Sequence, residues 1–482
     1  MSTKFNKTTQ TGFIRLSAMI FFVLTIAFFC RIAQYPLIIP LFLLFIGTHF
    51  YFLKKADIKI FLKLSLLLVL LVFTVYLSQE YKIFSLFYIP TAAVAMLTML
   101  LFNDLELAFL MALTSSLVVS LIGRLELSMM LTLFLGSLIG AHTVRGARTR
   151  GQVMGAGLFV SIVQLICFIL SDLDSQRFMS PELLAQFLYP LMANGLIAAF
   201  VVIATLKIFE YLFGVLTNFS LLELSDFNHP LLKRMILEAP GTYHHSLVVS
   251  NLAEAAADAI GVHSLLTRVG AYYHDIGKLV NPEYFNENQA GMGNKHDKIE
   301  PSVSRLVILN HVKEGLELGK KYKLNQQILD FIPEHHGTSL MHYFYQKALE
   351  ETQDSKTINE ENFRYPGPKP QTKEAAIIML SDSCEGATRS LEDLNPANIE
   401  ETVKKIINNK FIDGQLDECH LTLAEINKIS AVFARILSAM HHSRIKYPEK
   451  KNGSKNGISS RKSSEKDISQ LLSDQKDRES NP

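Results

Sequence analysis

The stretch Ala271–Leu279, AYYHDIGKL, sets an imidazole, a carboxylate and an ammonium close together in an otherwise apolar run. His274 and Asp275 are adjacent, and Lys278 follows three residues later. A helix end is one explanation, because Asp-Ile-Gly-Lys is a plausible helix stop. A metal site is another, although adjacent side chains on a helix point in different directions. The stretch alone leaves both interpretations open.

Other positions of the same half offer imidazole or carboxylate groups, several of them where helices are expected to end. His244-His245 follows APGTY, His311 stands in ILNHVKEG, His335-His336 follows FIPE, and Asp382 closes the apolar run IIMLSDS. A lone histidine is usually a surface or capping residue, but five such positions together favour a metal cluster. Imidazole and carboxylate suit Fe, Mn or Zn, and a carboxylate such as Asp275 can bridge two ions. Two neighbouring ions can clamp a phosphorus centre and activate water for in-line displacement.

The elements that must position these groups are expected to be helices. Periodicity and helix formers predict helices around 251–260, 264–274, 300–319, 325–332, 338–351, 372–390, 396–410 and 422–442, the first ending at Gly261 and a further one opening at His244-His245. Residues 291–297 and 352–371 are expected to be polar connections. The segment 449–482, rich in Lys, Ser, Asn and Asp, is predicted to be disordered.

The first half of the chain is predicted to cross a membrane. Eight apolar blocks run over approximately 13–30, 36–53, 60–78, 84–102, 105–122, 126–142, 154–171 and 184–214. Most are close to the minimum length for a hydrocarbon core of about 30 Å. The first is interpreted as a retained span, because no signal-peptide cleavage pattern follows it. The last is long enough to continue into the cytoplasm as a helix.

Lysines and arginines near the span ends predict the orientation. Ten lie on the side of the N-terminus: Lys4, Lys7, Arg15, Lys54, Lys55, Lys59, Lys63, Arg145, Arg148 and Arg150. Four lie on the opposite side: Arg31, Lys82, Arg124 and Arg177. The N-terminus is therefore expected in the cytoplasm, and eight spans return the chain to that side.

Composition excludes several classes of function. A net charge of +2 gives no sign of a nucleic-acid surface. The four cysteines lie far apart without a CxxC pair, which argues against a disulfide scaffold. Polar residues such as Gln164 and Asn194 are sparse within the spans and favour helix packing, so a transporter is disfavoured.

Five motifs in order, GTYHHS, YYHDIGK, HVKEG, EHHGTSL and IIMLSDSCEGATRSL, resemble the HD-domain phosphohydrolases. More narrowly they resemble the seven-transmembrane HD subfamily, whose better known members hydrolyse cyclic di-AMP. The segments LLELSDFNHPLLKRMILEAPGTYHHS and FRYPGPKPQTKEAA also match, so the likeness covers about 215–445, and the preceding spans in kind. Each motif is weak alone, whereas the ordered set is highly specific. His274-Asp275 looks like the doublet that names the superfamily.

The resemblance implies a dinuclear site, with Mn or Fe as the expected ions. One ion would be held by His245, His274, Asp275 and Asp382, and the other by His311, His335 and His336, with Asp275 bridging. His245 is preferred to His244 because its spacing to the doublet fits the family. His274, Asp275 and Lys278 would be catalytic, and Lys278 and Arg389 would contact the substrate phosphate. A solvated cation at a helix end remains the alternative for Lys278.

We therefore expect an all-α protein in which a multi-span transmembrane helical bundle (1–214) precedes a cytoplasmic all-helical HD domain (215–448) and a tail (449–482). The resemblance implies a multi-pass protein of the bacterial cell (inner) membrane, with its N-terminus and HD domain in the cytoplasm. Its partners would be a cyclic dinucleotide substrate and the lipid bilayer, without nucleic acid, and a homo-oligomer is left open. The expected reaction opens cyclic di-AMP to linear pApA.

Two departures from the subfamily accompany the likeness. Members usually place a large extracytoplasmic domain after the first span, where this chain has only Arg31–Tyr35, and Lys295 stands where proline is common. Two other functions stay open: hydrolysis of another nucleotide, such as cyclic di-GMP or a hyperphosphorylated guanine nucleotide, and nucleotide binding by a receptor without catalysis. The GYP motif of cyclic di-GMP hydrolases is absent from the sequence, and a complete ligand set argues against the receptor. Tyr272, Tyr273, Tyr343 and Tyr345 are candidates for lining the substrate pocket.

Overall fold

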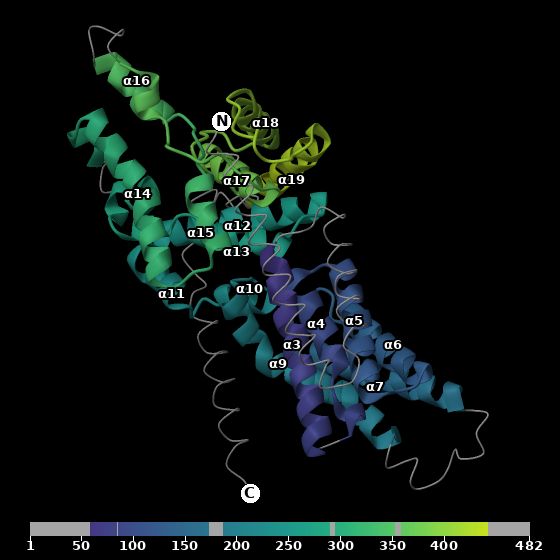
Figure 1. Ribbon diagram of the computed structural model, residues 1–482. Coiled ribbons are helices and arrows are strands. Elements are labelled where there is room, and N and C mark those ends of the chain that lie inside the picture. The colour runs from purple at the N-terminus through teal and green to yellow at the C-terminus, as the bar shows by residue number, and fades with distance from the viewer. Residues whose placement is uncertain (1–57, 84, 173–186, 290–294, 352–357, 442–482) are drawn as a thin grey trace, which may run out of the picture. The chain divides into compact units, whose positions relative to one another are not determined.

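The computed structural model describes residues 58–83, 85–172, 187–289, 295–351 and 358–441 (Figure 1). These ranges are helical and contain no strand, and one isolated antiparallel bridge joins Leu340 to Arg364. The predicted all-α fold class is confirmed. Buried apolar side chains form two large cores, one drawn from residues between Leu64 and Phe213 and the other from residues between Leu221 and Leu437.

The first core belongs to a bundle of apolar helices. Its elements are α3 (Ile58–Tyr81), η1 (Leu86–Tyr88), α4 (Thr91–Phe102), α5 (Leu105–Gly123), α6 (Leu127–Thr143), α7 (Arg150–Asp172) and α9 (Tyr189–Phe213). Helix α4 packs against α5, α6 and α9, and α7 packs between α6 and α9. Four of them, α3, α5, α7 and α9, are long and apolar enough to cross a membrane, while Leu86–Phe102 and Leu127–Thr143 are shorter. Six predicted spans thus coincide with apolar helices, and the blocks 13–30 and 36–53 lie outside the described residues.

The predicted span 84–102 is not one continuous helix. Pro90 has no backbone N–H, and the chain passes from η1 through an extended Ile89 into α4 at Thr91. The interruption frees the carbonyls of Phe87 and Ile89, and the buried side-chain amide of Asn194 donates to both at 2.8 Å. Gln164 donates in turn to Asn194 Oδ1 at 3.3 Å. A polar side chain thereby satisfies backbone groups that hydrocarbon would leave unpaired.

The second core belongs to the helices that carry the histidines. They are α10 (Asn218–Leu224), α11 (Pro230–Glu238), α12 (Pro240–Ile260), α13 (Ser264–Tyr273), α14 (Pro301–Lys321), α15 (Gln326–Glu334), α16 (His342–Glu351), α17 (Lys373–Arg389), α18 (Pro396–Ile412) and α19 (Leu423–His441). Short 3-10 turns join them: η3 (Ile276–Leu279), η4 (Pro282–Tyr284), η5 (Asn286–Asn288), η6 (Lys295–Lys298) and η8 (Glu360–Phe363). The predicted tail 449–482 lies outside the described residues.

The helix expected at 251–260 and the one expected to open at His244-His245 form a single helix, α12, and two helix starts differ from the prediction. Helix α12 begins at Pro240 and not at His244, because proline is favoured in the first turn of a helix, so His245 lies within α12. Helix α16 begins at His342 and not near residue 338, because Gly337 has a φ of +55° and Leu340 pairs with Arg364. The predicted end of α12 at Gly261, which has a φ of +74°, is confirmed.

A close approach of two backbones fixes the doublet relative to α14. A Cβ added to Gly277, in η3, would lie 1.7 Å from the carbonyl oxygen of His311. Only glycine permits this contact, which holds η3 directly against the turn of α14 that carries His311. Gly277 therefore has a packing role as well as a place at a helix end.

Candidate metal centre

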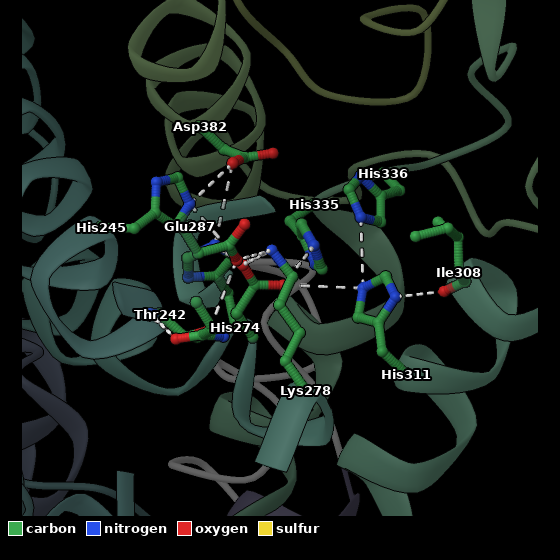
Figure 2. A network of polar contacts seen from close by, with 12 residues as sticks. Thr242, His245, His274, Lys278, Glu287, Ile308, His311, His335, His336 and Asp382 are labelled. Carbon is green, nitrogen blue, oxygen red and sulfur yellow. Dashed lines mark hydrogen bonds and ion pairs between the residues drawn. The ribbon is translucent and has the colours of Figure 1, made fainter. Parts of the chain in front are cut away.

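Seven buried or partly buried side chains from α12, α14, α17 and the turns after α13 and α15 meet at one point (Figure 2). They form two groups, His245 with His274, Asp275 and Asp382, and Asp275 with His311, His335 and His336. Within each group the possible ligand atoms lie within 4.8 Å of one another. These are the seven residues and the two groups expected from the resemblance. His244, the alternative to His245, is exposed.

Asp275 belongs to both groups and turns one oxygen to each. Its Oδ2 lies 3.2 Å from His274 Nε2 and 3.6 Å from His245 Nε2. Its Oδ1 lies 3.6 Å from the Nε2 atoms of both His311 and His335. A carboxylate placed in this way can bridge two cations.

Four of the imidazoles are held through Nδ1, which leaves Nε2 facing the centre. His274 and His335 contact the carbonyls of Ala271 and Ile332 at 2.7 and 2.6 Å, and His311 contacts the carbonyl of Ile308. His245 Nδ1 lies 2.7 Å from Glu385 Oε2. A hydrogen bond from Nδ1 fixes the tautomer and leaves the Nε2 lone pair available, as a metal ligand requires.

The centre contains polar atoms that have lost water without gaining a hydrogen-bond partner. In the described part of the chain, the buried Nε2 of His335 and Oδ1 of Asp275 have no hydrogen-bond partner. The Nε2 atoms of His245 and His274 face carboxylate oxygens of the cluster, Asp382 Oδ1 at 3.0 Å and Asp275 Oδ2 at 3.2 Å. His311 and His336 also bring their Nε2 atoms to 3.2 Å from each other. Orphaned acceptors in a buried cluster are costly unless a cation satisfies them, so the donor set fits divalent metal ions.

Electrostatics favour the protonation states that metal binding needs for Asp275, His311 and His336, but not for His245. Burial by itself raises the pKa of Asp275, but His274 and Lys278 beside it hold that pKa well below its ordinary value. Burial lowers the pKa of His311 to about 4 and that of His336 well below 6.5. For His245, burial lowers the pKa, but the carboxylates of Asp382 and Glu385 outweigh it and raise the pKa to about 10. A proton on His245 must therefore leave before that nitrogen can bind an ion.

Lys278 lies inside the centre and is bound to carboxylates. Its Nζ is 2.7 Å from Asp275 Oδ2 and 2.8 Å from Glu287 Oε1, and it stands 5.0 Å from the centre of the Phe285 ring. Glu287 also accepts a hydrogen bond from Thr242 Oγ1 at 3.3 Å (Figure 2). Lys278 thus has two counter-ions in the structure, whereas either a phosphate contact or a solvated cation is expected from the sequence.

Arg389, the second residue expected to contact phosphate, pairs with Glu385. Its side chain is 43% exposed, whereas that of Glu385 is 8% exposed and contacts His245. Glu385 is a site residue that the sequence reasoning missed. Its position three residues after Asp382 in SDSCEGA places both carboxylates on one face of α17, which was a usable signal.

Tyr365 is not singled out by the sequence, although the motif FRYPGPKPQTKEAA contains it. Its ring stacks on His336 at a centroid distance of 4.1 Å and an interplanar angle of 23°. Burial raises the pKa of Tyr365, so its hydroxyl stays protonated. Tyr272 and Tyr273, which were candidates for the pocket wall, are buried in the core, and Tyr273 donates to the carbonyl of Leu224 at 2.7 Å. Tyr343 is 58% exposed on α16.

Comparison with known families matches both halves of the chain. Residues 32–217 match the family described as "7TM receptor with intracellular HD hydrolase", and residues 242–387 match the HD domain family. The first match begins after the predicted span 13–30 and covers the seven that follow it.

Two curated relatives are named cyclic-di-AMP phosphodiesterase PgpH. The protein of Bacillus subtilis is 37% identical over 426 residues, covering 84% of this chain and 59% of the relative. That of Listeria monocytogenes is 39% identical over 405 residues, covering 83% of this chain and 55% of the relative. The chain therefore spans little more than half the length of these relatives. A crystal structure of the L. monocytogenes PgpH HD domain in complex with cyclic-di-AMP is 49% identical, covers 45% of this chain and 100% of its own, and has a TM-score of 0.43.

Proposed function

Because the chain belongs to the family of seven-transmembrane receptors with an intracellular HD hydrolase domain, we propose that it is a membrane-anchored, metal-dependent phosphodiesterase that opens cyclic di-AMP to linear pApA. The observation that carries this proposal is the pair of buried His/Asp groups that share Asp275. The names of the two curated relatives support the substrate. The expected position of the enzyme is in the bacterial cell membrane, with the HD domain in the cytoplasm, where its nucleotide would be.

Two divalent ions bound by the seven residues would hold one phosphodiester and activate water for in-line attack on phosphorus. In the reaction, the oxygen of water bonds to phosphorus, the bond from phosphorus to the ribose 3′ oxygen breaks, and a proton passes to that 3′ oxygen. The product is the linear dinucleotide with a free 5′ phosphate. The donor set of five imidazoles and two carboxylates suits Mn or Fe, and we propose these ions.

The residues of the chain have separate parts in this scheme. Asp275 holds the two halves of the centre together through its two oxygens, and His274 lies against its Oδ2. Lys278 neutralises Asp275 and lies close enough to the centre to contact an oxygen of a bound phosphate. Arg389, whose side chain is 43% exposed, would contact the substrate phosphate, and its ion pair with Glu385 would help to position His245.

The closing experiment measures hydrolysis by the purified full-length chain in detergent, stripped of metal and then supplied with Mn²⁺ or Fe²⁺. Cyclic di-AMP and cyclic di-GMP are tested side by side at equal concentration, and the product is identified by chromatography. The proposal predicts metal-dependent formation of pApA and faster turnover of cyclic di-AMP than of cyclic di-GMP. Equal rates for the two nucleotides, or faster hydrolysis of cyclic di-GMP, would contradict the proposed preference for cyclic di-AMP. Hydrolysis retained in the double variant His274→Ala, Asp275→Ala would contradict the metal centre.

A further inference from the structure

Lys410, in the last turn of α18, is a partly buried cation without a counter-ion in contact. Its Nζ donates to the hydroxyl of Ser339 at 2.7 Å. Within the described ranges, no carboxylate lies within the 4.0 Å of an ion pair from this ammonium. The other cations at the centre are different, since Lys278 contacts Asp275 and Glu287, and Arg389 contacts Glu385.

The ammonium of Lys410 lies at the edge of the metal centre. Ser339 follows His336 by three residues, and the carboxylate charges that act on Lys410 are those of Asp382 and Asp413. Asp413 is already engaged by Arg364, at 2.9 and 3.2 Å to its two oxygens. Burial lowers the pKa of Lys410 below its ordinary value. A cation that is partly removed from water and left unpaired is costly, and a bound anion would relieve that cost.

The segments that carry Lys410 and Ser339 are fixed to each other by polar contacts. Arg364 donates to the carbonyl of Thr338 at 2.9 Å, and Gln415 Oε1 accepts from the backbone N–H of Thr338 at 2.9 Å. The N–H of Tyr365 donates to the carbonyl of Ser339 at 3.1 Å. The hydroxyl and the ammonium are therefore held in place before any ligand arrives, which lowers the entropic cost of binding.

We propose that Lys410 and Ser339 form a second phosphate subsite, which binds the phosphodiester of a cyclic dinucleotide that is not being hydrolysed. This inference rests on the proposed function, since a cyclic dinucleotide carries two phosphodiesters and the metal centre takes one. The backbone N–H of Ser339 donates to the carbonyl of the cluster residue His336 at 3.1 Å, so the ammonium bound to Ser339 lies next to the cluster. Lys410 makes no ion pair with any of the seven cluster residues in the described structure, so it is free to bind a phosphate other than the reacting one. An ammonium and a hydroxyl are both suitable donors to the non-bridging oxygens of the second phosphate.

The test compares two substrates in the full-length, metal-loaded chain in detergent. Cyclic di-AMP has two phosphodiesters, and bis(p-nitrophenyl) phosphate has one. Lys410→Met should raise KM for cyclic di-AMP roughly 10- to 100-fold, the range for a lost hydrogen bond to a charged group, with kcat changed far less. Ser339→Ala should shift KM in the same direction by less, and Lys410→Arg should restore part of it. Hydrolysis of bis(p-nitrophenyl) phosphate should stay at the wild-type level. Lys404→Met, an exposed lysine of the same helix paired with Glu400, is the matched control.

An unchanged KM for cyclic di-AMP in Lys410→Met would overturn the subsite. An equal loss with both substrates would also overturn it, since Lys410 would then act at the metal centre or on the fold. Inhibition of bis(p-nitrophenyl) phosphate hydrolysis by cyclic di-AMP separates this inference from the proposed function. A wild-type chain that is inhibited by cyclic di-AMP without cleaving it contradicts the proposed function, and loss of that inhibition in Lys410→Met still supports the subsite. A wild-type chain that neither cleaves cyclic di-AMP nor is inhibited by it overturns both.

Discussion

Glu385 offers a sensitive test of how the chain prepares its centre for metal. The contact of 2.7 Å between Glu385 and His245 Nδ1 joins side chains that are 8% and 6% exposed, so solvent screens it little. Glu385→Gln keeps a hydrogen-bonding group but removes the charge that orients the imidazole and the ion pair with Arg389. Loss of such a supporting carboxylate costs about 10- to 100-fold in metal affinity, or roughly 1.4 to 2.7 kcal/mol. Glu385→Ala should lie at the upper end.

The assay is a titration of the metal-stripped chain with Mn²⁺, followed by hydrolysis of cyclic di-AMP. Glu385→Gln should move the titration to higher Mn²⁺, and activity should recover in large part at saturating metal. Glu374→Gln, on the same helix but bonded to the backbone N–H of His263, is the control and should leave the titration unchanged. A wild-type titration curve for both Glu385 variants would refute the role given to this carboxylate.

Three further predictions concern packing, pH and topology. Gly277→Ala should lower the free energy of unfolding by roughly 1–3 kcal/mol or more and weaken metal binding, because its Cβ would meet the carbonyl of His311. Gly386→Ala, with nothing within 4 Å of the new Cβ, is the control and should raise the free energy of unfolding by about 0.5–1 kcal/mol. Urea unfolding measures both. Burial lowers the pKa of His263, so the stability that the neutral ring contributes is present above its ordinary pKa of 6.5 and is lost as pH falls below that value. His263→Asn, which preserves the cap of α13, should therefore flatten the dependence of Tm on pH below about 6.5, and an unchanged slope would contradict the assignment. A reporter fused after Leu216 should behave as cytoplasmic, and an external signal would mean that the spans are miscounted.

Much of the fold follows from local patterns in the sequence. Long apolar blocks and the alternation of helix formers with Gly and Pro predict elements that the described structure contains. The exceptions arise where one residue overrides the pattern. Pro90 interrupts an apolar block whose composition alone predicts a continuous helix. The side chain of Asn194, distant in sequence, donates to the carbonyls of Phe87 and Ile89 at this interruption. Periodicity cannot detect a hydrogen bond between residues more than a hundred positions apart.

The candidate ligands could be chosen from the sequence because five motifs in a fixed order resemble those of the HD-domain phosphohydrolases, and the resemblance implies which imidazoles and carboxylates bind metal. Their supporting residues were harder to identify, since a carboxylate such as Glu385 looks like any other polar residue of a helix. Lys278 shows the same limit. Its ion pairs with Asp275 and Glu287 depend on how η3 packs against α14 and η5 against α12, and no spacing rule encodes those contacts. Lys410 is still more remote, since α18 meets the site only through tertiary packing.

The most direct test of the central claim is the stoichiometry of activation. The metal-stripped full-length chain is titrated with Mn²⁺ under tight-binding conditions while pApA formation from cyclic di-AMP is recorded. A dinuclear centre in which Asp275 is shared by the two ions predicts that activity rises until two equivalents of metal are bound per chain. It also predicts that Asp275→Ala gives no activity at any metal concentration. A plateau at one equivalent, or pApA formation without metal, would contradict the dinuclear centre.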